Sequence, residues 1–380
     1  MTQKLFYENM YLQHFSATVT GCESAQDRWH ITLDATAFYP EGGGQPGDTG
    51  YLGNVRVIDT HSRRDEVIHI TDGPIQPGEK IEGKIDWEPR FSRMQHHTGE
   101  HIVSGLIHRL YGYDNVGFHM GHDAVTLDLS GELSGADLEK VERLANEAVW
   151  KNIPIEISYP SPEALAALDY RSKKELSGDV RIVTVPEYDI CACCGTHVHK
   201  TGEIGLIKLV NFQRYKGGIR IWMLCGGEAL EDYTRKNKDV FAVSALLSAK
   251  PHEITPALEH VLKERDGLKL ELGLLQDRLF EYKAAAIEQG SFTIQFEENL
   301  SPNELRKYCL ALCERCETAA VFSGKDREWK YAIGSKNQDV RVLGKAFNGA
   351  FSGKGGGKPG LIQGSVTGDP EAIKQFFQHP

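Results

Sequence analysis

The sequence has 380 residues, of which 25% are charged and 40% hydrophobic, and its formal net charge is −10 at pH 7. This length is enough for two or three domains of ordinary globular composition, and the acidic balance argues against a protein that coats nucleic acid with its whole surface. We find no apolar run of membrane-spanning length and no secretory signal, so we predict a cytoplasmic protein that binds no membrane. Its eight cysteines are then reduced thiols or metal ligands.

Residues 1–86 predict a small β-barrel domain. Short alternating runs of strand-forming residues are separated by Gly, Pro, Asn and Asp. Among them, residues 38–50 contain three consecutive glycines followed by Gln45 and Asp48. Glycines let a ligand approach the backbone closely, and the two polar residues are suited to hydrogen bonding a small ligand. The alternative is a flexible hairpin loop.

Residues 87–235 predict an α+β domain. Asp86 is a plausible N-cap for a helix that runs to about residue 110, where Gly112 stops it. This helix carries His97 and His101, and a spacing of four residues places both imidazoles on one helical face. Alone, such a pair is more simply explained as part of a core helix.

A second run supplies further metal-binding side chains. Cys193 and His197 bracket a short turn that contains Gly195. Together with His97 and His101 they provide three imidazoles and a thiolate, a ligand set that Zn²⁺ favours. The two runs together favour one metal site per chain over loose thiols and solvated histidines.

Residues 236–290 predict a helical arm. Thr255 and Pro256 read as an N-cap followed by a proline at the first helical position. The arm either folds back on the preceding helix or pairs with a second subunit, and we slightly favour a homodimer. Its coiled-coil seam has alternating spacings of four and three, with Arg265 as a defect, and comprises Ile254, Leu258, Val261, Arg265, Leu268, Leu272, Leu275, Leu279 and Tyr282.

Residues 291–380 predict a small α/β domain with a basic loop. Residues 323–358 contain eight Lys or Arg against three acids. Glycines between lysines suit the wrapping of a phosphate backbone, although a mobile basic loop explains the same composition. A helix over 302–317 would place Cys309, Cys313 and Cys316 on one buried face. The candidate phosphate contacts are Lys345, Lys354, Gly355, Gly356, Gly357 and Lys358, with Arg214 and Lys216 in a second basic run.

The sequence also contains the inverted zinc-protease motif. His97 and His101 flank Glu100 in the order HxxEH, in which the glutamate acts as a general base. Such enzymes usually add a carboxylate ligand, whereas this chain offers Cys193 and His197. A metallopeptidase therefore stays an alternative, and we expect Glu100 to point away from the face that carries the two histidines.

Three motifs together resemble the editing domain of alanyl-tRNA synthetase, and in particular its free-standing relatives, the AlaX trans-editing proteins, in their long form. They are residues 38–48, residues 97–101 and residues 193–197. Cys194 departs from this pattern, where the synthetases more often have glycine. The tail resembles the synthetase's C-terminal domain, which is associated with tRNA binding and dimer formation. The resemblance implies that His97, His101, Cys193 and His197 hold Zn²⁺, and that the substrate side of the site includes Thr36, Gly43, Gly44, Gln45 and Asp48.

The implied reaction is hydrolysis of the ester that joins a wrong amino acid to tRNA(Ala). Ser-tRNA(Ala) is the expected substrate, with Gly-tRNA(Ala) as a further candidate. A synthetase pocket separates side chains that differ by a methyl or hydroxyl group by only ~1–3 kcal/mol, so errors need a second, hydrolytic site. We expect the ATP-dependent aminoacylation core to be absent. Thr36 is the candidate partner for the serine hydroxyl.

The role of the metal divides the remaining hypotheses. Four protein ligands are typical of structural zinc, whereas catalytic zinc usually keeps one position open. In a deacylase the metal would therefore either activate water or only orient the substrate. A tRNA-binding protein with structural zinc is the third hypothesis, beside the deacylase and the metallopeptidase.

Overall fold

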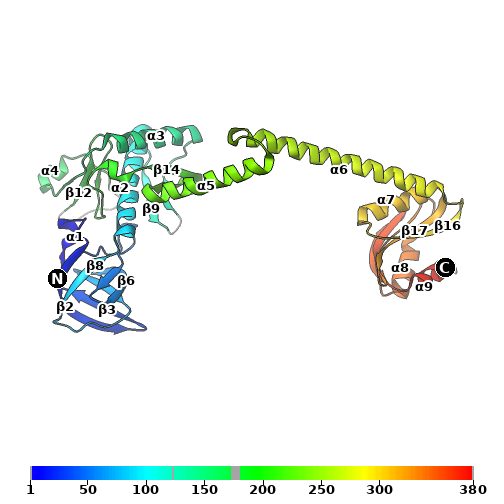
Figure 1. The fold of residues 1–380 in the computed structure, drawn as a ribbon, viewed down its shortest axis with the longest axis horizontal. Coiled ribbons are helices and arrows are strands. Elements are labelled where there is room, and N and C mark those ends of the chain that lie inside the picture. The colour runs from blue at the N-terminus through cyan, green and yellow to red at the C-terminus, as the bar shows by residue number, and fades with distance from the viewer. Residues whose placement is uncertain (1, 122–123, 173–179, 379–380) are drawn as a thin grey trace. The chain divides into compact units, whose positions relative to one another are not determined.

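The structure, a computed structural model, describes residues 2–121, 124–172 and 180–378 (Figure 1). It is a mixed α+β chain, as the sequence predicts, and it divides into two compact units, Met1–Val240 and Phe241–Pro380, each with its own hydrophobic cores. The predicted boundaries at 86, 235 and 290 stay predictions. None of the helices among the described residues combines the length and the apolar character needed to cross a bilayer.

The first unit begins with a ring of six antiparallel strands. The strands pair in the order β2-β3-β7-β6-β5-β8, and β8 pairs again with β2, which closes the ring. Alternate residues face an apolar interior, as the burial pattern of β8 shows. A short parallel pair, β1 with β4, and helix α1 accompany it. The bounds are β1 (Gln3–Lys4), α1 (Leu5–Glu8), β2 (His14–Ala25), β3 (Arg28–Leu33), β4 (Ala35–Thr36), β5 (Gly50–Leu52), β6 (Val55–Arg63), β7 (Glu66–Thr71) and β8 (Lys80–Ile85).

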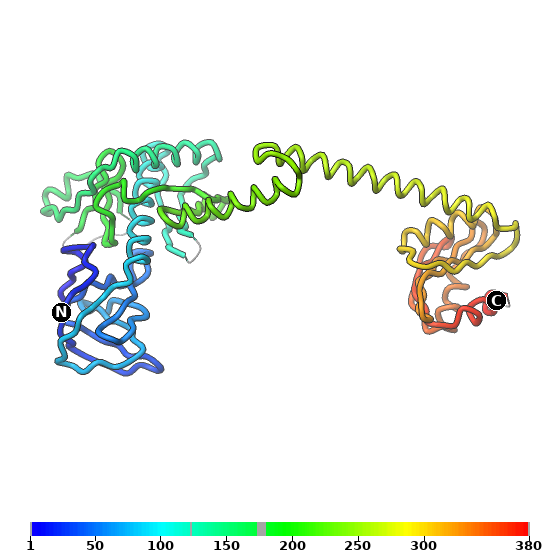
Figure 2. The backbone as a smooth tube through the Cα atoms, in the orientation of Figure 1, coloured from blue at the N-terminus to red at the C-terminus, as the bar shows by residue number. Residues whose placement is uncertain are grey.

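Helix α2 (Trp87–Tyr111) leaves this ring and forms the centre of the next layer (Figures 1 and 2). The helix follows Asp86 and ends at Gly112, whose φ of 70° is left-handed, so the predicted bounds are confirmed. Its middle is buried on nearly every side because it packs against α3, β13 and β15. Helix α3 (Gly135–Lys151) begins with a capping box formed by Ser134 and Asp137.

Two antiparallel sheets enclose α2. One has the strand order β14-β15-β10-β9 and the other β11-β12-β13. The predicted metal-binding cysteine follows β13 directly, which places it beside α2. The bounds are β9 (Asn115–Met120), β10 (Val125–Leu129), β11 (Glu156–Ser158), α4 (Pro162–Ala166), β12 (Ile182–Val185), β13 (Asp189–Ala192), η1 (Thr201–Ile204), β14 (Ile207–Tyr215) and β15 (Gly218–Cys225).

The second unit is built on a five-stranded sheet of order β16-β17-β18-β20-β19. One face packs on α7 and the end of α6, and the other packs on α8 and α9. Helix α5 (Gly226–Leu247) spans the boundary between the units. The remaining bounds are η2 (Pro251–Glu253), α6 (Ile254–Ala285), β16 (Gly290–Glu297), α7 (Pro302–Leu312), β17 (Cys316–Lys325), β18 (Glu328–Ser335), α8 (Val340–Ala350), β19 (Lys354–Lys358), β20 (Leu361–Thr367) and α9 (Pro370–Gln378).

Three local predictions for this unit are wrong. Lys354–Lys358 is the edge strand β19, paired with β20, and is not a loop. Helix α7 ends at Leu312, so Cys316 lies in β17 and only Cys309 and Cys313 share the helical end. Helix α6 begins at Ile254, one residue before the predicted N-cap Thr255, and residue 253 makes no side-chain capping bond.

Candidate metal centre

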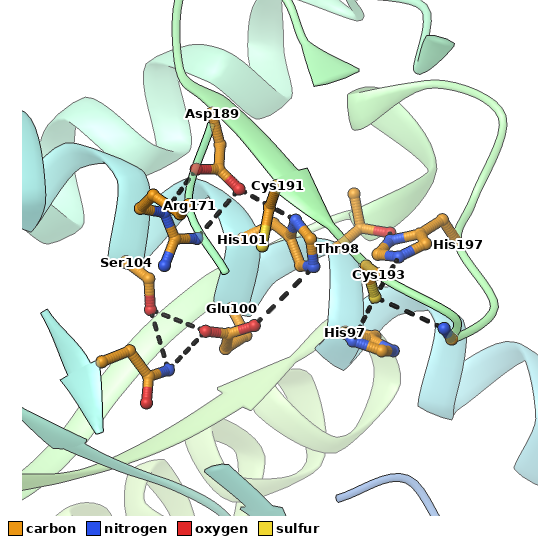
Figure 3. A network of polar contacts seen from close by, with 12 residues as sticks. His97, Thr98, Glu100, His101, Ser104, Arg171, Asp189, Cys191, Cys193 and His197 are labelled. Carbon is orange, nitrogen blue, oxygen red and sulfur yellow. Dashed lines mark hydrogen bonds and ion pairs between the residues drawn. The ribbon is translucent and has the colours of Figure 1, made fainter. Parts of the chain in front are cut away.

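The four predicted ligands come together in the first unit (Figure 3). His97 and His101 come from α2, and Cys193 and His197 come from the run after β13. Their donor atoms all lie within 4.8 Å of one another. The Cys193 Sγ lies 3.3 Å from His97 Nε2 and 3.4 Å from His197 Nε2. A tetrahedral Zn²⁺ with ordinary Zn–N and Zn–S bonds holds such atoms about 3.5 Å apart, so the residues present fit this metal.

An oxygen atom faces the Nδ1 atom of each of the three imidazoles. Gln45 Oε1 lies 3.1 Å from the Nδ1 of His97, and Thr98 Oγ1 lies 3.2 Å from that of His197. Asp189 Oδ2 lies 2.9 Å from the Nδ1 of His101. The Gln45 and Thr98 oxygens can accept hydrogen bonds from His97 and His197, and the Asp189 carboxylate forms an ion pair with His101. These contacts favour a proton on each Nδ1 and leave each Nε2 lone pair for a metal ion.

The turn of residues 193–197, here called the cysteine turn, packs closely against the His97 ring. A Cβ atom on Gly195 would lie 1.9 Å from His97 Cε1, so only glycine allows this approach. The Gly195 N–H donates to Cys193 Sγ at 3.3 Å. The buried guanidinium of Arg181 donates to the carbonyl oxygens of Cys193 and Gly195 at 2.7 and 3.0 Å. Sequence reasoning assigned Arg181 no role at the site, because its two carbonyl partners are defined only once the chain has folded.

The electrostatics of the site favour a thiolate. Burial alone would raise the pKa of the Cys193 thiol, but the His97 and His101 imidazoles hold that pKa well below its usual range. Burial, and next the neighbouring His97, lower the pKa of His197 to about 3, which keeps this imidazole neutral. Burial alone would lower the pKa of His101, but the Cys193 thiolate and next Asp189 hold that pKa well above its usual value. Metal binding, which requires a thiolate and neutral imidazoles, would therefore displace a proton from His101.

The first glycine run forms a tight turn that carries Gln45 into the site. Gly42 and Gln45 exchange backbone hydrogen bonds of 3.0 Å, and the φ angles of Gly43 and Gly44 are 62° and 86°. A Cβ on Gly44 would lie 2.5 Å from the carbonyl oxygen of Phe118. The turn therefore needs its glycines for backbone geometry.

Gln45 is fully buried, and its amide is held on both sides. Its Oε1 accepts from the Thr196 N–H at 3.2 Å, and its Nε2 donates to Thr196 Oγ1 at 2.9 Å. The side chain thus links the glycine turn, His97 and the cysteine turn. Its predicted contact with substrate stays a prediction.

Asp48 and Thr36, both predicted on the substrate side, are also fully buried. Asp48 pairs with Arg90 at 2.5 Å and accepts the Tyr39 N–H at 2.7 Å. Thr36 Oγ1 lies 2.8 Å from His69 Nε2. Asp48 thus ties the segment that carries the first glycine run to α2, and Thr36 ties β4 to β7. The predicted substrate roles of both residues stay predictions.

Glu100 lies beside the ligand set. Its Oε1 accepts hydrogen bonds from Ser104, at 2.7 Å, and from Asn115, and its Oε2 lies 4.0 Å from His101 Nε2. The carboxylate is engaged with neighbouring polar groups on the far side of His101 from Cys193 (Figure 3). Glu100 therefore lies near the metal-facing nitrogen of His101, and the expectation that it is not a ligand stays a prediction.

The predicted basic residues belong to both units. In the first unit, Arg214 pairs with Glu132 at 3.2 Å, and Lys216 lies 5.1 Å from the centre of the Tyr215 ring. In the second, Lys354–Lys358 forms the fully exposed strand β19, and α8, which carries Lys345, packs beside it.

Three family models match the chain. The "tRNA synthetases class II (A)" model matches residues 3–89, and the "Threonyl and Alanyl tRNA synthetase second additional domain" model matches residues 180–221, which include Cys193 and His197. The "DHHA1 domain" model matches residues 289–379. The matches thus cover the ring of strands, the cysteine turn and the five-stranded sheet.

Whole-chain relatives agree with these matches. The alanine–tRNA ligases of Pyrococcus abyssi and Methanoregula boonei are 30% and 33% identical over 99% and 98% of the chain, which spans about two fifths of their length, 43% and 42%. The alanyl-tRNA editing protein AlaX-L of Pyrococcus horikoshii is 30% identical over 98% of this chain and 96% of its own length. With a match along nearly the full length of both proteins, this chain belongs to the AlaX-L family of alanyl-tRNA editing proteins.

Proposed function

We propose that the protein is a trans-editing deacylase that hydrolyses the ester bond of mischarged Ser-tRNA(Ala), with Gly-tRNA(Ala) as a second candidate substrate. Membership of an alanyl-tRNA editing family supports the editing role. The observation that carries the hydrolytic role is the convergence of His97, His101, Cys193 and His197, with donor atoms within 4.8 Å of one another. One Zn²⁺ per chain suits this set.

Zn²⁺ bound there would polarise the ester carbonyl or a water molecule. The protein's own residues orient the metal ligands and determine the side from which the ester can approach. Gln45, Thr98 and Asp189 orient the three imidazoles. The three imidazole residues are at least 97% buried, whereas Cys193 is the least buried of the four candidate ligands. We infer that the ester approaches from the side of Cys193.

The decisive experiment incubates the full chain, loaded with zinc, with Ser-tRNA(Ala) and with Ala-tRNA(Ala). We expect selective release of serine, and its loss in Cys193→Ala, a variant whose fold is checked by circular dichroism. Inertness toward both esters would contradict the deacylase and favour a tRNA-binding protein with structural zinc. Cleavage of casein that needs the same cysteine would favour the metallopeptidase.

We also propose that strand β19 contacts the tRNA backbone. Lys354 and Lys358 end a strand of three glycines at the edge of the sheet, and all five residues are exposed. Bare glycines let a phosphate chain approach an edge strand closely, and backbone N–H groups and lysines are common phosphate partners. Lys345, on the adjacent helix α8, extends the same positive region.

A second copy of the chain is the partner we propose for α6. Leu268, Leu272 and Leu275 of the predicted seam are 53–58% exposed in the single chain. A row of half-exposed leucines at alternating spacings of three and four is typical of a helix that pairs with another helix. Because exposed apolar surface is unfavourable in water, pairing of two copies would bury it.

Sedimentation of the full chain tests this pairing. We expect a dimer that Leu268→Lys/Leu272→Lys converts to a monomer. The control is Leu270→Lys/Leu274→Lys, because these leucines have the same spacing and are 67% and 54% exposed but lie off the seam. A monomeric wild type, or equal effects of the two double variants, would contradict the proposal.

A further inference from the structure

We infer that Asp189, held in place by Arg171, is a positioning residue that fixes His101 for the metal and is not itself a metal ligand. This inference rests on the proposed metal-dependent function. Neither Asp189 nor Arg171 belongs to a motif that stands out in the sequence.

The contacts link three side chains in series, of which His101 and Asp189 are buried and Arg171 is mostly buried (Figure 3). Asp189 Oδ2 lies 2.9 Å from His101 Nδ1, on the opposite side of the ring from Nε2. Arg171 Nε donates to Asp189 Oδ1 at 2.6 Å, and Arg171 Nη2 donates to Oδ2 at 2.9 Å. The side chains of Asp189 and Arg171 are 1% and 13% exposed. A two-point contact with a planar guanidinium fixes both the position and the rotation of the carboxylate.

The backbone positions both Asp189 and Arg171 beside His101. Asp189 begins β13, the strand that leads to Cys193, so one strand delivers both a ligand and the support of another ligand. The Arg171 N–H donates to the Ile190 oxygen at 2.9 Å, and the Arg171 oxygen accepts the Ala192 N–H at 2.9 Å. These two bonds tie Arg171 to the same strand.

Helix α2 is shaped to receive Asp189. Gly105 lies one turn after His101 on α2, and a Cβ there would lie 2.3 Å from the Tyr188 oxygen and 2.8 Å from Asp189 Cβ. Glycine at this position therefore lets β13 approach α2 closely enough for the carboxylate to reach His101. A helix-interior glycine costs about 1 kcal/mol in helix propensity relative to alanine. The close approach of β13 explains why glycine nevertheless stands at position 105.

A second metal ion is the competing explanation. The donor atoms of His101, Asp189 and Cys191 also lie within 4.8 Å of one another. However, the Arg171 guanidinium contacts both oxygens of the Asp189 carboxylate and places a positive charge beside any ion bound there. The His101 ring would also have to serve two ions at once. The positive charge of Arg171 beside Asp189 therefore favours a role of Asp189 in orienting His101 over a second metal site.

Asp189 differs in kind from the other two supports. Gln45 and Thr98 are neutral, whereas Asp189 carries a charge that also raises the basicity of the imidazole it orients. Loss of such a support typically weakens metal affinity 10- to 100-fold. Asp189→Asn keeps the shape of the side chain but removes the charge, so it isolates this contribution.

The test measures zinc affinity of the full chain by competition with a chromophoric chelator. We expect Asp189→Asn to weaken zinc binding roughly 10- to 100-fold and to leave one ion per chain. The matched control is Asp128→Asn, because Asp128 makes the same two-point contact with Arg220, at 2.6 and 2.7 Å, between β10 and β15. We expect the control to change zinc affinity less than about twofold.

Three outcomes would overturn the inference. They are an unchanged affinity in Asp189→Asn, a loss no larger than that of the control, and two zinc ions in the wild type with one in the variant. If Asp189→Asn does not fold, Arg171→Gln replaces it, for which we expect a smaller loss in the same direction. His101→Ala and Cys193→Ala keep this test separate from the proposed function: zinc binding that survives both contradicts the metal site itself, whereas loss in both with no effect of Asp189→Asn contradicts only the positioning role.

Discussion

Residues 42–44 and residues 355–357 are both runs of three glycines next to polar side chains, but they have different structural roles. The first run forms a turn with left-handed φ angles at Gly43 and Gly44, and it delivers the buried Gln45 to the metal centre. The second is an extended, fully exposed edge strand between two lysines. A glycine run therefore gains its role from its surroundings, which are a buried polar network in the first case and solvent in the second.

The largest expected effect concerns the charge that anchors the first run. Asp48→Ala leaves Arg90 buried without its carboxylate, and breaking a buried ion pair in this way typically costs about 3–5 kcal/mol. Lys358→Ala, at the end of the second run, should change the free energy of unfolding by less than about 0.5 kcal/mol because the side chain is exposed. Urea unfolding of the three proteins measures both values. Equal stabilities would mean that Asp48 does not anchor the turn.

A slightly smaller effect is expected from the glycines themselves. Gly44→Ala forces a side chain into a left-handed conformation and against the Phe118 backbone, so we expect a loss of roughly 3 kcal/mol and weaker zinc binding. Gly356→Ala meets no atom within 4 Å and should lie within about 0.5 kcal/mol of the wild type. A Gly44 variant as stable as the Gly356 variant would remove the distinction between the two runs.

The stability of the ring of strands should also depend on pH, because its strand β7 contains the buried His69. Burial lowers the pKa of His69 to about 4, while its Nδ1–H donates to the Ile31 oxygen and its Nε2 accepts from Thr36. Below the unfolded pKa of about 6.5 the unfolded chain takes up a proton that the folded chain does not, so stability is full above pH 6.5 and falls toward pH 4. Between pH 7 and 5 the loss from His69 is about 2 kcal/mol.

Urea unfolding at pH 7, 6.5, 6 and 5 measures this loss in the wild type and in His69→Gln. The variant should be less stable at pH 7 but should lose about 2 kcal/mol less on acidification than the wild type. Parallel pH profiles of the two proteins would show that His69 is not the group responsible.

The four candidate metal ligands can be predicted from the sequence, whereas the residues that position these ligands cannot. The helix of His97 and His101 is predictable because its periodicity, Asp86 and Gly112 are local signals. Arg181, Asp189 and Arg171 were missed as site residues because they act through contacts that only the folded chain creates.

Strand β19 was missed for a related reason. Glycine has a low intrinsic preference for strands, and only the pairing of residues 354–358 with β20 makes this segment extended. The first glycine run was correctly marked as unusual, but the burial of Gln45 and Asp48 depends on α2 and the cysteine turn, which lie far away in sequence. Local pattern thus predicts the ligands, whereas tertiary contacts decide what each glycine run does.

The smallest change in stability is expected for a variant that removes both lysines beside the second glycine run. The same variant tests most directly whether this run contacts tRNA. Lys354→Ala/Lys358→Ala should leave unfolding unchanged but weaken binding of tRNA(Ala) to the full chain, and the slope of log affinity against log salt should fall by about 2, one for each lost phosphate contact. The control is Lys336→Ala/Lys374→Ala, which removes two exposed lysines of the same unit that pair with Glu314 and Glu371. If both double variants reduce the slope equally, net charge alone explains binding and β19 has no special role. If only the first does, the exposed strand is a phosphate contact, and its lysines act through their position beside the glycines and not through net charge alone.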